Sequence, residues 1–242
     1  MKDATTAVGV CERPFESTEA QVRALCETIT EQLRQALNQR PFASLAVSGG
    51  RSPVPLFQAL AQRNLPWSRI VVTLVDERCL PAGDPERNAT LVSAHLLQGA
   101  AAQARWIDWL RGCPEPHAVP DDALLQMALP QAQELALPLD VVVLGMGDDG
   151  HTASWFAHSP GLEQALHGHS LLSVVRPTTA PHRRLTLTRR AIAEARHRHL
   201  AWSGPRKAAV YRRARMRRDD ALPVSWLLHG DVSIDIWYTE RF

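Results

Sequence analysis

Short apolar runs that end in polar or glycine-rich turns recur along the chain, and a helix-like segment follows most of them. Three runs are nearly continuous, at residues 45–47, 70–75 and 139–143, and two shorter ones occur in "RLTLT" and "HLAWS". Strands that are apolar on both faces are typical of a parallel sheet covered on both sides. Because strands and helices alternate, the pattern predicts an α/β protein with a mostly parallel sheet.

Residues at the predicted helix starts agree with this pattern. Ser52 is a good N-cap for the first helix after a strand, and Pro53 suits the first helical position. Thr188 is the expected cap of the helix after "RLTLT". Gly204 and Pro205 are expected to form the turn and the helix start after "HLAWS".

Prolines interrupt the pattern at two places. The segment at residues 111–122, "RGCPEPHAVPDD", is predicted to be a loop rather than a domain boundary. Pro130 predicts a break or kink in the helical segment between Asp122 and Leu137. Because no repeat or long linker is visible in 242 residues, we expect a single domain spanning residues 1–242.

Composition and charge exclude several classes of protein. The chain is 45% hydrophobic, which argues against disorder, and its net charge of +2 gives a weak overall field. The basic residues between 206 and 218 are interpreted as a solvated helix face, so no nucleic-acid partner is expected. No apolar stretch approaches the roughly 18 residues of a membrane span, and the N-terminus lacks a signal-peptide core. Four scattered cysteines fit a reducing compartment, and we expect a cytoplasmic protein that does not contact membranes.

Four polar motifs follow the predicted strands, each at the carboxyl end. They are the pair Gly49-Gly50, the triplet at 76–78, the loop at 145–151 and the turn at 204–207. Ligands of open α/β sheets bind at this edge, so the four motifs are expected to converge. "SGGRSP" places glycine amides beside a helix start, which suits a phosphate, although an ordinary tight turn has the same sequence features.

Two of these motifs contain groups that could carry out a reaction. His151 in "GDDGH" is placed near a helix start, whose positive end would keep the ring neutral as a general base requires. The alternative is a capping or core-edge histidine. In "VDER", Asp76 could bind substrate hydroxyls while Arg78 faces an anion or an oxyanion. The alternative for Arg78 is a local salt bridge.

Other candidate residues are assigned to structure rather than to chemistry. "HGH" and "HRH" could suggest a metal, but no third ligand stands at a recognised spacing, so neither a metal nor a cofactor is expected. Trp106 and Trp109 are interpreted as core residues. Cys79 is interpreted as an inert buried thiol, although Arg78 stands beside it.

The motifs together resemble the 6-phosphogluconolactonase family. "SGGRSP", "VDER" with Asn88, "LGMGDDGHTAS", "RRLTLT" and "SGPRKA" occur in that family's order and approximate spacing, from about Phe15 to the C-terminus. The resemblance implies a three-layer αβα sandwich, Rossmann-like and similar to glucosamine-6-phosphate deaminase and ribose-5-phosphate isomerase. It also implies cofactor-free hydrolysis of 6-phospho-D-glucono-1,5-lactone to 6-phosphogluconate in the pentose phosphate pathway.

The resemblance also implies roles for individual residues. The catalytic histidine falls on His151, and the active-site acid and arginine fall on Asp76 and Arg78. His151 would deprotonate a water that attacks C1, Arg78 or the amides of the 145–150 loop would stabilise the oxyanion, and Asp76 would bind hydroxyls or orient the water. The expected substrate and phosphate site comprises Gly49, Gly50, Arg51, Ser52, Asn88, Gly147, Asp149, Gly150, Arg183 or Arg184, and Lys207.

This chain departs from the family pattern at several positions. Ser52 replaces the usual threonine, and Arg87 stands where serine commonly precedes the asparagine. "SWFAHSP" replaces the usual ending of the histidine motif, so the sequence leaves open the effect of Trp155 and His158 on the fine shape of the pocket. The alternative functions are a sugar-phosphate deaminase or isomerase, or a non-catalytic sugar-phosphate sensor. The expected partner is a sugar-phosphate lactone, bound by a monomer or a weak homodimer.

Overall fold

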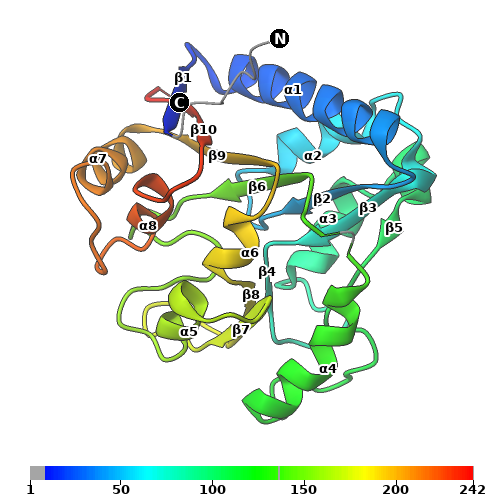
Figure 1. The fold of residues 1–242 in the computed structure, drawn as a ribbon, viewed down its shortest axis with the longest axis vertical. Helices are drawn as coiled ribbons and strands as arrows, with labels where there is room; N and C mark the ends of the chain where they lie inside the picture. Colours follow the sequence, from blue (N-terminus) through cyan, green and yellow to red (C-terminus); the bar gives the residue numbers. More distant parts are fainter. Residues whose placement is uncertain (1–8, 136, 242) are drawn as a thin grey trace.

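A seven-stranded sheet in which every strand pair is parallel forms the centre of the molecule (Figure 1). The computed structural model describes residues 9–135 and 137–241. The strand order is β1-β10-β9-β6-β2-β3-β5. The strands are β1 (Val10–Pro14), β2 (Ala43–Val47), β3 (Ile70–Leu74), β5 (Arg105–Trp106), β6 (Val141–Gly145), β9 (His197–Ser203) and β10 (Ile234–Thr239).

Helices cover this sheet on both sides. Figure 1 shows α1 and α2 on one side, and α6 with a smaller sheet on the other. The helices are α1 (Thr18–Gln39), α2 (Val54–Ala61), α3 (Asn88–His95), α4 (Asp121–Gln133), α5 (Leu162–His167), α6 (Arg189–Ala193), α7 (Pro205–Ala214) and α8 (Ser225–Leu228), with 3-10 turns η1 (Trp67–Arg69) and η2 (Gly99–Gln103). The predicted α/β class with a mostly parallel sheet is confirmed.

Burial explains why the central strands are apolar. All five residues of β2 and all five of β3 are buried, because helices pack against both faces of the sheet. Helix α1 contributes a stripe at Leu25, Ile29 and Leu33, spaced four residues apart along one face. The interpretation of Trp109 as a core residue is confirmed, since only 2% of it is exposed.

The smaller sheet is antiparallel and was not predicted. Its strand order is β4-β8-β7, with bounds β4 (Asp76–Arg78), β7 (Leu172–Val175) and β8 (Arg184–Leu187). A single residue, Val75, separates the end of β3 from the start of β4. The chain therefore passes from the apolar run at residues 70–75 directly into a different sheet. An apolar run does not show where the chain passes from one sheet to another, because the strands of both sheets are buried.

Two of the predicted helix starts are confirmed, and the one at Ser52 is not. Thr188 caps α6 by accepting a hydrogen bond from the Ala191 N–H, and α7 begins at Pro205 after Gly204, as predicted. The prediction for Ser52 is wrong. Helix α2 begins at Val54 with Pro53 as its N-cap and with no side-chain cap, because the glycine turn after β2 uses residues up to 53.

Two further helix predictions need correction. No helix begins at His151, and the next helix, α5, begins at Leu162. Helix α4 runs through Pro130 without a break. Pro130 lies in the last turns of that helix, where its missing N–H removes only a hydrogen bond near the helix end. Of the predicted loop at 111–122, residues 111–120 form turns and loop, whereas residues 121–122 already belong to α4.

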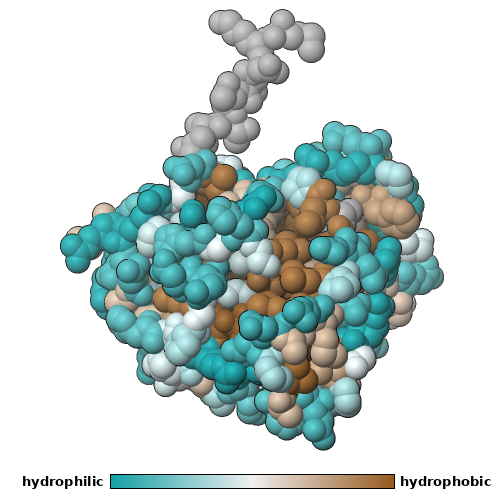
Figure 2. Space-filling model, turned by 60° about the horizontal axis from the view of Figure 1, so that its bottom comes forward, coloured by the Kyte–Doolittle hydropathy of each residue, from teal (hydrophilic) through white to brown (hydrophobic). Residues whose placement is uncertain are grey.

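The surface is mainly hydrophilic. On the face shown in Figure 2, hydrophobic residues gather in the centre and hydrophilic residues surround them. Among the described residues, no helix is both long and apolar enough to cross a lipid bilayer.

Candidate active site

The four polar turns meet at one cavity of about 280 Å³ at the carboxyl edge of the large sheet. This is the edge at which open α/β sheets bind ligands. The predicted residues that line the cavity are Gly49, Gly50, Ser52, Asp76, Arg78, Asn88, Gly147, His151, Arg184 and Lys207. Arg51, Asp149, Gly150 and Arg183 are not among the lining residues. The structure therefore brings together most, but not all, of the set expected from the sequence.

The ring of His151 is held on two sides. Its Nδ1 lies 2.5 Å from Oδ1 of Asp149, and its face stacks on Phe156 with ring centroids 4.2 Å apart. Burial opposes ionisation of Asp149, but the hydrogen bonds and charge of His151 outweigh it and lower the pKa of Asp149. In the neutral form of the ring, an ionised Asp149 accepts the proton of Nδ1, and Nε2 is then the acceptor. The nearby acid, rather than a helix start, orients this ring.

The glycines of this loop make room for the histidine. A Cβ atom on Gly147 would lie within 2.5 Å of Nδ1 and Cε1 of His151 and 2.5 Å from Oδ1 of Asp149. The loop closes through hydrogen bonds from Gly147 N–H to His151 O, at 2.9 Å, and from Gly150 N–H to Gly147 O, at 3.1 Å. Gly150 has φ +81°, a conformation that favours glycine. Packing against His151 thus explains Gly147, and the positive φ explains Gly150.

Asp76 and Arg184 form a buried polar pair on the cavity wall. Oδ2 of Asp76 accepts a hydrogen bond of 2.5 Å from Ser154 Oγ and lies 3.7 Å from a guanidinium nitrogen of Arg184. The guanidinium of Arg184 also lies over the ring of Phe156, 5.2 Å from its centroid. Burial lowers the pKa of Arg184, and Asp76 partly offsets that effect. Ser154 and Phe156 were missed from the sequence, although both stand in the histidine motif.

The pairing of β4 with β8 decides which side chains face each other. Arg78 is opposite Arg184, and Asp76 is opposite Thr186, while Glu77 is opposite Leu185. Directly opposite residues share a face of a sheet, and neighbours along a strand alternate between faces. Asp76, Arg78 and Arg184 therefore share the cavity face, and Glu77 points to the other side.

Glu77 is a fully buried acceptor behind the cavity. Its carboxylate accepts hydrogen bonds from the backbone N–H groups of Arg78 (2.6 Å), Asn88 (2.9 Å) and Ala89 (2.9 Å), and one from Nε of Arg87 (3.2 Å). Burial raises the pKa of Glu77, and Arg87 and the backbone hydrogen bonds partly offset that rise. Glu77 thus caps α3 from outside the helix and fixes the backbone at two residues of the cavity wall.

Arg78 does not form the local salt bridge that the sequence allowed. Its guanidinium donates a hydrogen bond to the Glu86 carbonyl. Glu77 pairs instead with Arg87, which is 2% exposed and also binds Asp108 at 2.7 Å. Arg87, the departure noted beside Asn88, is therefore a structural residue of this buried network.

The pair Gly49-Gly50 allows the chain to approach α3 closely. A Cβ atom on Gly49 would overlap the side-chain amide of Asn88, whose Nδ2 donates to the Asp76 carbonyl at 2.8 Å. Gly50 has φ +92°. Lys207 lies on the same cavity, in the first turn of α7, and burial lowers its pKa while Asp148 partly offsets that effect. Glycine amides, a helix start and a partly desolvated cation together suit an anion.

Comparison with known proteins identifies the family of the chain. Residues 16–236 match the family model described as glucosamine-6-phosphate isomerases/6-phosphogluconolactonase.

The chain belongs to this family.

The chain aligns with the following relatives over nearly the whole length of both proteins. A 6-phosphogluconolactonase of Pseudomonas aeruginosa is 42% identical over 95% of this chain and 95% of its own. One from Neisseria meningitidis serogroup A is 36% identical over 93% of this chain and 97% of its own. The crystal structure of a 6-phosphogluconolactonase from Shewanella baltica superposes with a TM-score of 0.88 at 36% identity, covering 95% of this chain and 97% of that one.

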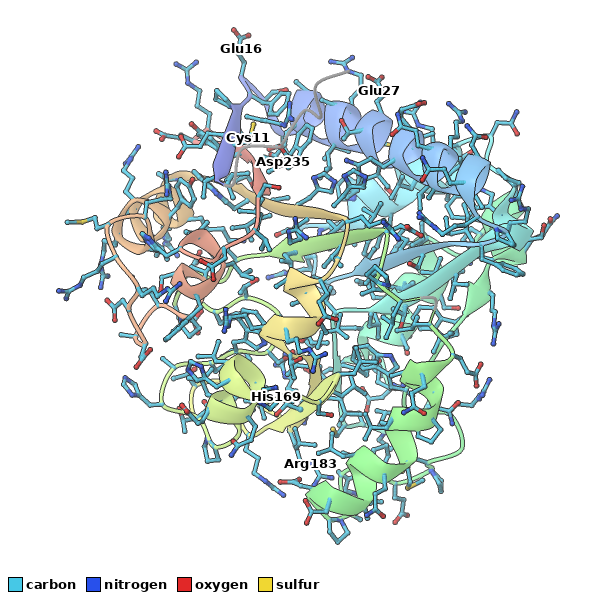
Figure 3. The ribbon with its side chains drawn as sticks, in the orientation of Figure 1. Cys11, Glu16, Glu27, His169, Arg183 and Asp235 are labelled. Atoms are coloured by element: carbon cyan, nitrogen blue, oxygen red, sulfur yellow. The ribbon has the colours of Figure 1, made fainter. Side chains whose placement is uncertain are left out.

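In this member of the glucosamine-6-phosphate isomerase/6-phosphogluconolactonase family, only one of the two candidate arginines reaches the cavity. Arg184 lines it, whereas Arg183 turns to helix α4 (Figure 3). Arg183 binds Asp121 at 2.6 Å and donates to the Pro116 carbonyl. The two arginines therefore have different surroundings, and Arg184 is the one placed to contact a ligand in the cavity.

Trp155 and His158, two departures from the family pattern, lie outside the cavity lining. Trp155 is fully buried and donates from Nε1 to the Leu187 carbonyl at 3.0 Å. His158 is exposed, and neither residue is part of the lining.

His199 and Cys79 have structural roles. His199 is buried between Gln32, bound at 2.8 Å through Nε2, and Trp237, which donates to Nδ1 at 3.0 Å. Within residues 9–135 and 137–241, no group of three or more His, Cys, Asp or Glu side chains is arranged to hold a metal ion. Cys79 is 1% exposed and burial raises its pKa to about 11, so the thiol is held protonated as expected.

Proposed function

We propose that this protein hydrolyses 6-phospho-D-glucono-1,5-lactone to 6-phosphogluconate, the second step of the oxidative pentose phosphate pathway. The names of its relatives and the chemistry of the cavity both support the proposal. The observation that carries it is that His151, whose ring is hydrogen-bonded to Asp149, lines a cavity that Arg78, Arg184 and Lys207 also line. A lactone is an activated ester, so a positioned base and an anion site are sufficient for its hydrolysis.

In the proposed mechanism His151 acts as the general base. Asp149 holds the Nδ1 proton, so Nε2 takes a proton from a water molecule as that water attacks C1. The carbonyl π electrons move to oxygen and form a tetrahedral oxyanion. When the oxyanion collapses, the bond from C1 to the ring oxygen breaks, and the ring oxygen takes the proton back from His151. The product is the open-chain 6-phosphogluconate, and the histidine is restored.

The other cavity residues would bind and polarise the substrate. Arg78, or the amides of the 145–150 loop, would stabilise the oxyanion. Asp76 would accept hydrogen bonds from sugar hydroxyls, held in place by Ser154 and Arg184. The amides of Gly49-Gly50 with Lys207 and Arg184 would bind the phosphate. Holding the phosphate fixes C1 relative to the base and lowers the entropic cost of reaction.

The decisive test measures lactone hydrolysis above the spontaneous rate, with His151→Asn as the control. The wild-type protein should accelerate hydrolysis, and His151→Asn should lower kcat by roughly 10²- to 10⁴-fold while the protein stays folded. Wild-type kcat in a folded His151→Asn protein would remove His151 from the mechanism.

The same preparation distinguishes the alternatives. Ammonia release from glucosamine 6-phosphate without lactone hydrolysis would indicate a deaminase. Binding of 6-phosphogluconate without any turnover would indicate a sensor.

A further inference from the structure

The cavity wall holds most of the unpaired buried polar atoms of the described chain. Within residues 9–135 and 137–241, six buried side-chain nitrogen or oxygen atoms have no hydrogen-bond partner. Four of them belong to residues that line the cavity, namely Gln21 Oε1, Ser48 Oγ, Arg184 Nε and Trp202 Nε1. A buried polar atom without a partner costs about 1–3 kcal/mol, so such atoms gather where a ligand or water satisfies them.

Gln21 presents a fixed acceptor from helix α1. Its side-chain Nε2 donates to the carbonyls of Trp202, at 3.2 Å, and Trp237, at 2.7 Å. These two bonds tie the amide to the ends of β9 and β10 and leave Oε1 as the unpaired atom. Gln21 is only 4% exposed, which shows that its polar end is directed into the molecule rather than to solvent.

Trp202 presents a fixed donor beside it. The indole stacks on Tyr238, with centroids 4.7 Å apart, and tilts against Tyr211 at 5.2 Å. Packing therefore holds the ring, which is 3% exposed, and its Nε1–H has no protein partner among the described residues. A buried tryptophan N–H usually finds an acceptor, and Trp202 is one of the residues that line the cavity.

We propose that Gln21 and Trp202 form a subsite that binds one hydroxyl group of the sugar, rather than its phosphate. A hydroxyl both donates and accepts, so it satisfies Oε1 and Nε1–H together. A phosphate dianion only accepts and would be repelled by Gln21 Oε1. The assignment rests on the proposed function, because the lactone ring carries the hydroxyls.

The test compares two tryptophan variants that each remove an unpaired buried N–H. Trp202→Phe keeps an aromatic ring against the tyrosines but removes the donor. Trp109→Phe is the matched control, because Trp109 Nε1 is also buried and unpaired but lies outside the cavity lining. Trp202→Phe should raise KM about three- to tenfold at unchanged kcat, the scale of one neutral hydrogen bond. Trp109→Phe should leave KM unchanged.

The choice of substrate distinguishes a hydroxyl from the phosphate. The KM increase in Trp202→Phe should be the same for 6-phosphogluconolactone and for unphosphorylated gluconolactone. An increase confined to the phosphorylated lactone would overturn the hydroxyl assignment and indicate a phosphate contact. Unchanged KM for both lactones, in a protein with wild-type thermal stability, would overturn the subsite itself.

Substrate analogues that each lack one hydroxyl, combined with the protein variants, identify the bound hydroxyl. The 2-, 3- and 4-deoxy phosphogluconolactones are assayed with wild type, Trp202→Phe and Gln21→Met. For the analogue that lacks the bound hydroxyl, either substitution should add no further loss. Additive losses for all three analogues would contradict the proposal. If the wild-type protein hydrolyses no lactone, the proposed function fails. The wild type and the variants are then compared by calorimetric measurement of their affinity for 6-phosphogluconate. Equal affinities would overturn the subsite.

Discussion

Replacing Gly147 by alanine should disable the reaction without unfolding the protein. The backbone φ of Gly147 is not in the positive range that favours glycine. Alanine at this position therefore meets no conformational strain. The added Cβ would lie 2.5 Å from Asp149 Oδ1 and closer still to two ring atoms of His151. The substitution therefore acts directly on the pair that orients the proposed base.

The size of the effect follows from the overlap. Non-bonded carbon atoms pack at about 3.5–4.0 Å, so the imidazole must move by roughly 1 Å or more. A misplacement of about 1 Å can lower a rate by roughly 10²-fold. The side chain of His151 is 31% exposed and that of Asp149 is 47% exposed, so both can move toward solvent. We expect kcat to fall about 10²-fold, with a loss of unfolding free energy below about 1 kcal/mol.

The assay is steady-state lactone hydrolysis corrected for the spontaneous reaction, together with thermal unfolding. Gly9→Ala is the control, because a Cβ at Gly9 meets no atom within 4 Å and Gly9 lies outside the cavity lining. The control should retain wild-type kcat. Wild-type kcat in a folded Gly147→Ala protein would show that the position of the His151 ring does not limit the reaction, which would refute the reasoning above.

Four further predictions test other parts of the site and the fold. Arg184→Ala should lower kcat/KM about 10- to 100-fold, and Arg183→Ala should change kcat/KM by less than about threefold. A larger loss for Arg183→Ala than for Arg184→Ala would show that Arg183 is the arginine that contacts the substrate. Arg87→Met should cost about 3–5 kcal/mol in urea unfolding, because it leaves two carboxylates without their partner, one of them fully buried; a loss under about 1 kcal/mol would contradict that network. Burial lowers the pKa of His199 to about 4 against the opposing charge of Asp235, so its contribution to stability is complete above pH 6.5 and disappears as the pH falls toward 4. His199→Gln should flatten that decline in unfolding free energy, and an unchanged slope would contradict the assignment. Extensive treatment with EDTA should leave lactone hydrolysis intact, and activity restored only by added zinc would contradict metal-free chemistry.

Local patterns in the sequence were sufficient for the parts of the fold that depend on burial. The apolar runs of β2, β3 and β6 identified the buried strands, because a strand covered on both faces must be apolar at successive positions. The polar and glycine-rich turns after them marked one edge, because parallel strands end at the same edge of a sheet. Helix starts that depend on one residue and its immediate neighbours, at Thr188 and Gly204, were also predictable.

The tertiary structure decided the partners within the site. Asp76 is bound by Ser154, which lies 78 residues away along the chain, and Glu77 pairs with Arg87 rather than with its neighbour Arg78. The antiparallel register of β4 and β8 places Arg184 opposite Arg78, while Arg183, just before β8, binds Asp121 of α4. Hydrogen-bond partners of this kind depend on strand register and on which face each side chain takes. Periodicity along one segment reports how much that segment is buried, but it carries no information about the segment packed against it.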